Sequence, residues 1–167
     1  MIKVILCASI IVLCGFVGYG VSNSFTQRKK FFFCFSNFLN LLRSDISFSS
    51  TKLETIIKKQ LNFPSLSKEF KQMLKNYLLT LQSNLILNND TLFKGITILS
   101  NEEMDRLYYF FSKLGKVDIK NQIEEIDKMF SVNEIYLTQS NFESKKYSSL
   151  YVKLGIIIGA FVAIVII

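Results

Sequence analysis

The sequence of 167 residues contains neither histidine nor tryptophan. Histidine is the most frequent metal ligand among side chains and the one that most often moves protons near neutral pH. Without histidine, a zinc or iron site would need cysteines or carboxylates alone, and acid–base catalysis lacks its usual residue. The composition therefore predicts no metal and no cofactor.

Cysteine and proline are also scarce, with three residues of the first and one of the second. Cys7 and Cys14 lie in the first hydrophobic segment and Cys34 follows it, with no CxxC spacing among them. We interpret them as small apolar packing residues rather than as a disulfide framework or a metal site. The chain has no internal repeat and no low-complexity linker, and its length is that of about one domain.

Catalytic motifs are not recognisable in the sequence, which has neither a glycine-rich phosphate loop nor a nucleophile beside a base. The carboxylate pairs Glu102–Glu103 and Glu124–Glu125 are most simply solvated helix faces with favourable first-turn charge. We expect a protein that is not an enzyme and binds no small-molecule substrate.

Hydrophobic residues, by contrast, make up 50% of the chain and are concentrated at its two ends. Val4 to Val21 is an uncharged apolar run of the length that crosses a bilayer. Gly15, Gly18 and Ser22 fall near one side of this helix and would allow another helix to approach closely. We predict an N-terminal transmembrane helix within residues 1–25.

Basic residues follow this segment rather than precede it. Only Lys3 lies before the apolar run, whereas Arg28, Lys29 and Lys30 come soon after it. The positive-inside rule favours a retained anchor with a cytoplasmic C-terminal flank over the alternative of a cleaved signal peptide.

A run of phenylalanines comes next. Aromatic side chains beside cationic ones suit a membrane interface, which predicts an interfacial position for Phe31, Phe32, Phe33 and Phe35. The helical period continues further, so core packing is the simplest role for a stripe that contains Phe31, Phe35, Phe38, Leu42 and Ile46.

The last third of the chain, Asp118 to Ile167, is predicted to be one unbroken helix about 75 Å long. Its apolar or small residues form a seven-residue repeat that begins at Ile119 and turns polar at Asn133 and Ser140. Residues 150–167 are predicted to form a C-terminal transmembrane helix that continues this charged helix.

The C-terminal span carries small residues on one face. Gly155, Gly159 and Ala163 follow one another in steps of four, a pattern that supports close helix packing in membranes. The apolar run after Lys153 is about 21 Å long, which is short for a bilayer, so the Lys153 ammonium group is expected to reach back to the headgroups. A neighbouring helix would stabilise such a span, and the candidates are the first span and another subunit.

Several shorter helices are predicted between the two ends. Capping boxes at Thr51–Glu54 and Ser100–Glu103 begin two of them. A longer helix begins near Ser65 or Ser67 and carries apolar residues as far as Leu85.

The connections between these helices carry their own signals. Asn88 to Asp90 is predicted to turn the chain, and Thr91 to Leu99 to be a short helix or loop. Gly115 is predicted to end a helix with a left-handed C-cap, and Asp118 to cap the final helix.

Charge is distributed unevenly within the net charge of +7. Residues 28–75 contain ten basic and three acidic side chains, whereas residues 90–143 contain six basic and ten acidic ones. Because the basic half follows the first span, anionic lipid headgroups or an acidic partner surface are expected neighbours, and nucleic acid is not.

These features predict an all-α protein, a helical bundle soluble domain at 26–149 flanked by two transmembrane helices at 1–25 and 150–167. Lys145, Lys146 and Lys153 precede the second span, so the positive-inside rule places the soluble domain in the cytoplasm and both termini outside. A soluble helix continuous with a membrane anchor indicates a component of an assembly.

One motif makes a specific resemblance. Leu114, Gly115, Asp118 and Gln122 form the pattern LG-x-x-D-x-x-x-Q, which ends one helix and begins the next. With the N-terminal span followed by a basic residue (Arg28) and the Leu-Gly-rich C-terminal span, this pattern resembles the stage III sporulation protein AB family of endospore-forming Firmicutes. The chain departs from the family at Lys52, where proline is usual, and in Thr91 to Leu99, which lacks the family's tryptophan.

The resemblance implies a place in the mother-cell membrane around the forespore, within the channel complex that reaches the forespore. It also implies a cytoplasmic domain similar to the platform component of type II secretion systems, working beside a cytoplasmic ATPase and other channel subunits. Two alternatives remain open at this point. One is a membrane-anchored exported protein, and the other is a helical module that binds anionic lipid through its basic half.

Overall fold

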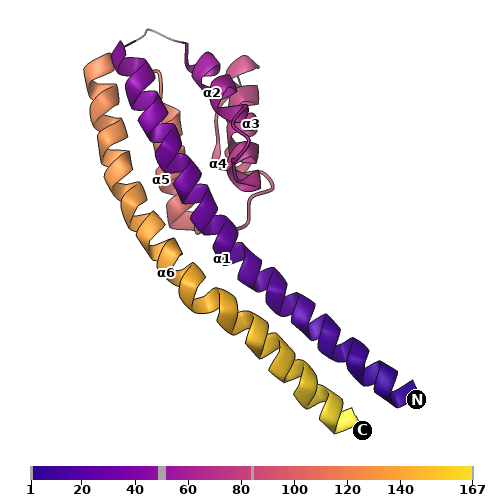
Figure 1. The fold of residues 1–167 in the computed structure, drawn as a ribbon. Coiled ribbons are helices and arrows are strands. Elements are labelled where there is room, and N and C mark those ends of the chain that lie inside the picture. The colour runs from indigo at the N-terminus through magenta and orange to yellow at the C-terminus, as the bar shows by residue number, and fades with distance from the viewer. Residues whose placement is uncertain (1, 49–51, 84, 167) are drawn as a thin grey trace. The chain divides into compact units, whose positions relative to one another are not determined.

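The computed structural model describes residues 2–48, 52–83 and 85–166, and within these ranges the side chains of 2–8, 47, 48 and 166 are not described. The described chain is all-α and contains no strand (Figure 1). Its helices are α1 (Ile2–Phe48), α2 (Leu53–Leu61), α3 (Lys68–Gln82), α4 (Asn89–Leu92), α5 (Asn101–Lys113) and α6 (Ile119–Ile166). The predicted fold class is confirmed.

The chain divides into two compact units. The paired-helix unit consists of Met1–Lys29 and Thr138–Ile167, and the bundle unit consists of Lys30–Leu137. Both α1 and α6 continue through the boundary without a break, and each is long and apolar enough to cross a membrane. The unbroken helix predicted after Asp118 is therefore confirmed.

Phenylalanine rings from α1 form the centre of the bundle unit. Phe31, Phe35 and Phe38 are fully buried. Phe31 and Phe38 contact Phe70 of α3, with ring centroids 5.4 and 5.9 Å apart, and Phe38 also stacks on Phe111 of α5 at 6.1 Å. The stripe is core, as its period predicted, because each turn of α1 brings another ring to the same side.

The interfacial interpretation of the phenylalanine run is wrong for three of its four residues. Phe31, Phe32 and Phe35 have no exposed surface, and only Phe33 is exposed, at 57%. The helical period already indicated a core position for Phe31 and Phe35, but for Phe32 the local sequence fits an interface beside lysines as well as a core. Packing against α3, α5 and α6 decides in favour of the core.

Most helix starts in the bundle unit follow their predicted caps. Ser67 accepts from the backbone N–H of Phe70 at the start of α3, and Ser100 and Glu103 form the predicted reciprocal capping box of α5. At α2, however, the N-cap is Lys52, which makes no side-chain capping bond, and Thr51 lies outside the described residues.

The segment between α3 and α5 is more ordered than its sequence indicated. Asn88 does not merely turn the chain but caps α4, in a capping box with Thr91. The rest of the ambiguous segment is loop, with Gly95 at φ 81°. Because α3 already ends at Gln82, the predicted helical position of Leu85 is wrong, and this residue is 67% exposed.

The seam of α6 is polar where the sequence predicted it, within the bundle unit at Asn133. This side chain is fully buried, and its Nδ2 donates to the backbone carbonyl of Phe32 at 3.2 Å. Ile119, predicted to begin the seam, is instead 59% exposed, and burial begins at Gln122 and Ile126. The first turn of α6, residues 119–121, is exposed, so the predicted seven-residue pattern starts too early.

The aromatic core makes a direct prediction about stability. We expect Phe35→Ala to lower the free energy of unfolding by about 3–5 kcal/mol, because it leaves a cavity among fully buried rings. Phe33→Ala, two positions away on the exposed side of α1, should change it by about 0.5 kcal/mol or less. Denaturant unfolding of the full-length chain in detergent, followed by circular dichroism, measures both. Equal losses would contradict the described core.

Candidate functional site

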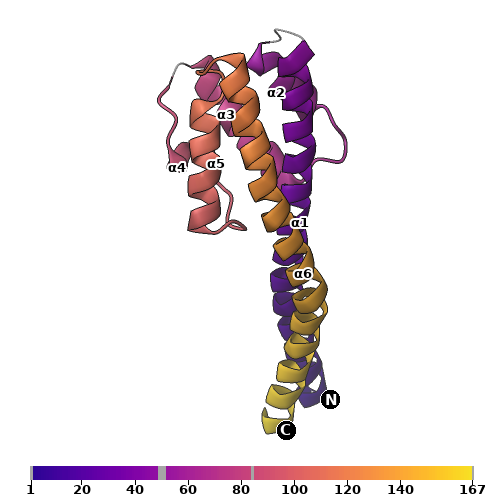
Figure 2. The same cartoon turned by 90° about the vertical axis from the view of Figure 1, so that its left-hand side faces the viewer.

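The first predicted site is the face of small residues in the paired-helix unit, where α1 and α6 lie side by side (Figure 2). A Cβ added at Gly18 would lie 2.5 Å from the backbone oxygen of Tyr151, and one at Gly155 would lie 2.6 Å from that of Cys14. Real Cβ atoms do not come this close to backbone atoms. Glycine is therefore required at both positions for the two backbones to touch.

The same seam continues towards the ends of the chain. A Cβ at Gly159 would lie 2.9 Å from the Cα of Ile11, and Ala163 is buried. Gly15 stands at the edge of the seam, since its Cβ would meet only a side-chain atom of Ile156, at an ordinary 3.9 Å. The structure thus brings together the two predicted small faces, and α1 packs against the small face of α6.

Further along the contact between α1 and α6, polar and aromatic side chains replace glycine. Ser22 is buried, and its hydroxyl shares a 2.6 Å hydrogen bond with that of Ser148. One turn on, the ring of Phe25 stacks on Tyr151, with centroids 5.7 Å apart. A pair of hydroxyls that bond each other is well suited to a helix interface with little water.

The predicted interfacial basic residues lie in different environments. Arg28 makes an ion pair with Glu143, and both side chains are largely buried, whereas Lys29 is half-buried. Lys30 and Lys153 are exposed. The pairing of Arg28 with Glu143 cannot be predicted from local sequence, because the two residues are more than 100 positions apart.

The second predicted site is the family motif between α5 and α6. Leu114 is buried, with φ −60° and ψ 125°, and Gly115 has φ 77°. The N–H of Lys116 donates to the carbonyl of Lys113 at 3.0 Å. These values describe a type II β-turn, which requires positive φ at its third residue. The predicted positive φ is confirmed, but the helix ends at an extended Leu114 rather than in a left-handed C-cap.

The second half of the motif begins α6. Asp118 accepts from the backbone N–H of Asn121 at 3.3 Å and also from the Asn121 side-chain amide, so the predicted cap is confirmed. These hydrogen bonds hold the pKa of the Asp118 carboxyl below its usual range, because they stabilise its charged form. Gln122 is buried, and its N–H donates to the Asp118 carbonyl at 2.9 Å. The Asp118 side chain therefore has a local role in this helix start.

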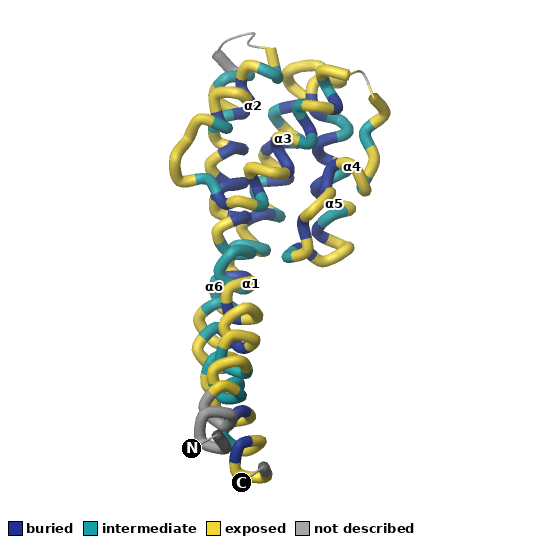
Figure 3. Tube along the Cα trace, turned by 90° about the vertical axis from the view of Figure 1, so that its right-hand side faces the viewer, coloured by how far each residue is buried: buried dark blue, intermediate teal, exposed yellow. Residues whose placement is uncertain are grey.

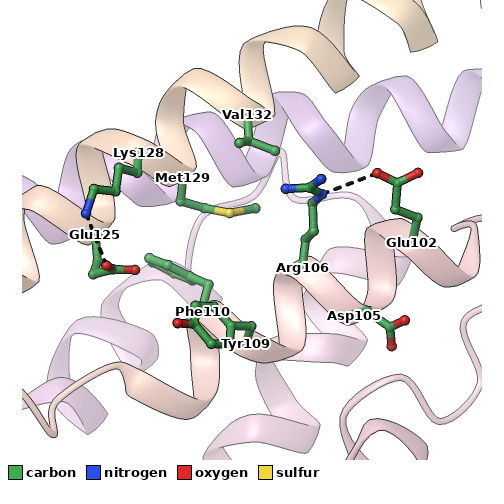
Figure 4. A pocket seen from close by; sticks show the side chains of 9 residues that line it. All are labelled: Glu102, Asp105, Arg106, Tyr109, Phe110, Glu125, Lys128, Met129 and Val132. Carbon is green, nitrogen blue, oxygen red and sulfur yellow. Dashed lines mark hydrogen bonds and ion pairs between the residues drawn. The ribbon is translucent and has the colours of Figure 1, made fainter.

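A third feature, which sequence reasoning did not identify, is a groove between α5 and α6 of ≈ 560 Å³ (Figure 4). Its lining combines apolar, aromatic and charged side chains from both helices: Glu102, Asp105, Arg106, Tyr109, Phe110, Glu125, Lys128, Met129 and Val132. Arg106 pairs with Glu102 and Lys128 with Glu125 along their own helices. Helical spacing places these residues on one side of each helix, but only the packing of α5 beside α6 makes them a groove.

No cluster of three or more potential metal ligands is found in the described part of the chain. Of the three cysteines, Cys34 is buried and its sulfur accepts from the backbone N–H of Ser67 at 3.3 Å, while Cys14 lies in the glycine seam. The side chain of Cys7 lies outside the described residues. These positions give both described cysteines a packing role.

The structure has two long apolar helices and an all-α bundle. It therefore belongs to the class of helical proteins with two candidate membrane spans. The model of the stage III sporulation protein AB family matches residues 3–167. The chain therefore belongs to the stage III sporulation protein AB family, which gives it a role in stage III of sporulation. This is a family of structural sporulation proteins and not a known family of enzymes. No curated protein and no solved structure matches the chain.

The glycine seam is tested by two neighbouring glycines of α1. Gly18→Ala should lower the stability of the helix pair by about 1–3 kcal/mol, because the added methyl group meets backbone atoms that cannot move aside. Gly20→Ala is the matched control, since its Cβ would have nothing within 4 Å. The midpoint of unfolding of the full-length chain by sodium dodecyl sulfate, titrated into mild detergent, measures the difference. If both variants unfold at the same midpoint, the seam is not a tight contact.

Proposed function

We propose that the protein is a structural membrane component of the channel complex between mother cell and forespore, with the bundle unit in the mother-cell cytoplasm. Membership of the stage III sporulation protein AB family across residues 3–167 is the observation that carries this proposal. The two apolar helices support an anchor in the membrane.

The proposed orientation rests on the distribution of cations along α1 and α6. Arg28, Lys29 and Lys30 follow the first span, and Lys145, Lys146 and Lys153 precede the second. Cytoplasmic flanks of membrane helices carry such an excess of lysine and arginine. On this basis residues 26–149 are the cytoplasmic domain, and residues 1–25 and 150–167 are the spans.

The ring contacts around Phe25 support the same assignment of the membrane boundary. Phe25, Tyr147 and Tyr151 form an aromatic cluster in the paired-helix unit, with centroids 5.7 to 6.3 Å apart. Tyrosine prefers the membrane–water interface, where its ring is in apolar surroundings and its hydroxyl is hydrated. The helix pair continues beyond this cluster to Arg28 and Glu143, on the proposed cytoplasmic side.

The partnership with a cytoplasmic ATPase and with other channel subunits comes from the resemblance to platform proteins of secretion systems. A platform of this kind has to hold its cytoplasmic domain at the membrane while a soluble enzyme binds that domain from the cytoplasm. Two closely packed membrane helices and a compact bundle meet that requirement. The protein would then contribute position and contact rather than chemistry.

Orientation is tested with a cysteine at Lys94, which is exposed in the bundle unit. In intact growing cells that express the chain, Lys94→Cys should not react with a membrane-impermeant thiol reagent, and it should react after the membrane is permeabilised. Lys3→Cys, on the opposite side of the first span, is the control and should react in intact cells. Labelling of Lys94→Cys before permeabilisation would favour an exported protein instead.

Assembly is tested by affinity purification of the tagged full-length chain from sporulating cells. We expect a secretion-type ATPase and other stage III proteins to copurify, as identified by mass spectrometry. The same tagged chain expressed in non-sporulating cells is the control for non-specific capture. Recovery of the chain alone from sporulating membranes, after crosslinking, would contradict the proposed role.

A further inference from the structure

The bundle unit has two faces of opposite charge. The helices α2 and α3 carry five lysines and two glutamates, a balance of +3, and all five lysines are exposed. Helix α5 and residues 119–137 of α6 carry seven acidic and four basic residues, a balance of −3. Figures 1 and 2 show α2 and α3 on one side of the bundle unit and α5 with the start of α6 on the other. Their charges are therefore presented in opposite directions.

The basic face is organised as a stripe along α3. Lys68, Lys71, Lys75 and Leu79 are separated by three, four and four residues, so they lie on one side of the helix over about 16 Å. All four are exposed, Leu79 at 63%. Among the described residues, these three lysines have no ion-pair partner, and Figure 3 shows exposed positions along α3 in yellow.

The acidic face contains the groove between α5 and α6. Figure 4 shows Phe110, Met129 and Val132 between the two helices, with the carboxylates of Glu102, Asp105 and Glu125 around them. The groove also contains Arg106 and Lys128, which are held by Glu102 at 3.3 Å and by Glu125 at 3.4 Å. These two cations offset part of the acidic charge but leave an excess of carboxylate, and Tyr109 is 56% exposed beside them.

We infer that the occupant of the groove is a second copy of this chain, bound through the lysine stripe of its α3. The three lysines match the carboxylate rim, and Leu79 supplies an apolar side chain for the groove floor. A helix bound in a groove by anchors on one side is a common mode of recognition, and complementary charge directs the encounter.

The contact is heterologous, since each copy uses its basic face towards one neighbour and its acidic face towards the other. Such contacts continue from copy to copy, and they close into a ring or extend as a row. Membrane spans give every copy the same orientation in the bilayer and confine the copies to two dimensions, which raises their effective concentration. The inference stands apart from the proposed channel role, because self-association is measured with no other subunit present.

The test reverses each face separately in the full-length chain. Variant A carries Lys68→Glu, Lys71→Glu and Lys75→Glu, and variant B carries Glu102→Lys, Asp105→Lys and Glu125→Lys. Differently tagged copies are reconstituted into vesicles of phosphatidylcholine alone, which excludes anionic lipid, and co-capture after brief crosslinking measures association. Each variant alone should associate at least about tenfold less than the wild type, because like charges then face each other.

The mixture of A with B is the decisive sample. In this mixture the acidic α3 of variant A meets the basic groove of variant B, and the basic α3 of variant B meets the acidic groove of variant A. Association should therefore return towards the wild-type level. Such a recovery would also show that both variants fold. Lys94→Glu combined with Lys116→Glu, two exposed positions outside both faces, should associate like the wild type. Raising the salt concentration from 0.05 to about 0.5 M should weaken wild-type association.

Three results would overturn the inference. Association of A or B alone at the wild-type level would show that the reversed face is not in the contact. If the mixture of A and B did not regain association, the two charged faces would not bind each other, and their ligands would be lipid or a different protein. Wild-type association that does not respond to salt would exclude a contact directed by charge.

Discussion

The helices α2 to α5 have at most 15 residues each, a length at which an isolated helix is only marginally stable in water. The bundle unit therefore depends on the apolar face that α1 offers them, because burial of that face is where most of the stabilisation arises. Phenylalanine suits this purpose, since one ring contacts several helices at once. Phe38, for example, lies against both Phe70 and Phe111. The caps at Ser67 and Ser100 then determine where each short helix begins.

In the paired-helix unit the same two long helices use a different kind of contact. Lipid tails are as apolar as leucine, so helix association in a membrane gains little from hydrophobic burial and depends on close packing and hydrogen bonds. On the proposed membrane location, this explains why α1 packs through phenylalanines in the bundle unit but brings glycines and Ser22 to its contact with α6 in the paired-helix unit. Gly18 and Gly155 allow backbone contact, and the bonded hydroxyls of Ser22 and Ser148 follow it.

The family motif lies in the connection between α5 and α6, the two helices that form the groove. Residues 114–122 make the type II turn and the N-cap that set α6 beside α5. None of Leu114, Gly115, Asp118 and Gln122 lines the groove itself. The motif residues therefore position the two helices of the groove rather than line it, which is consistent with a protein whose contribution is structural.

The sequence by itself determined the all-α class, the two apolar ends, and most of the helix starts, because these depend on periodicity and on hydrogen bonds within a few residues. It also predicted the buried polar position at Asn133 and the positive φ of Gly115. Only the tertiary structure placed Phe32 in the core, paired Arg28 with Glu143, and formed the groove beside Phe110. Each of these three features depends on contacts between residues that are far apart in the chain. The local sequence around a residue does not indicate which distant side chain will pack against it.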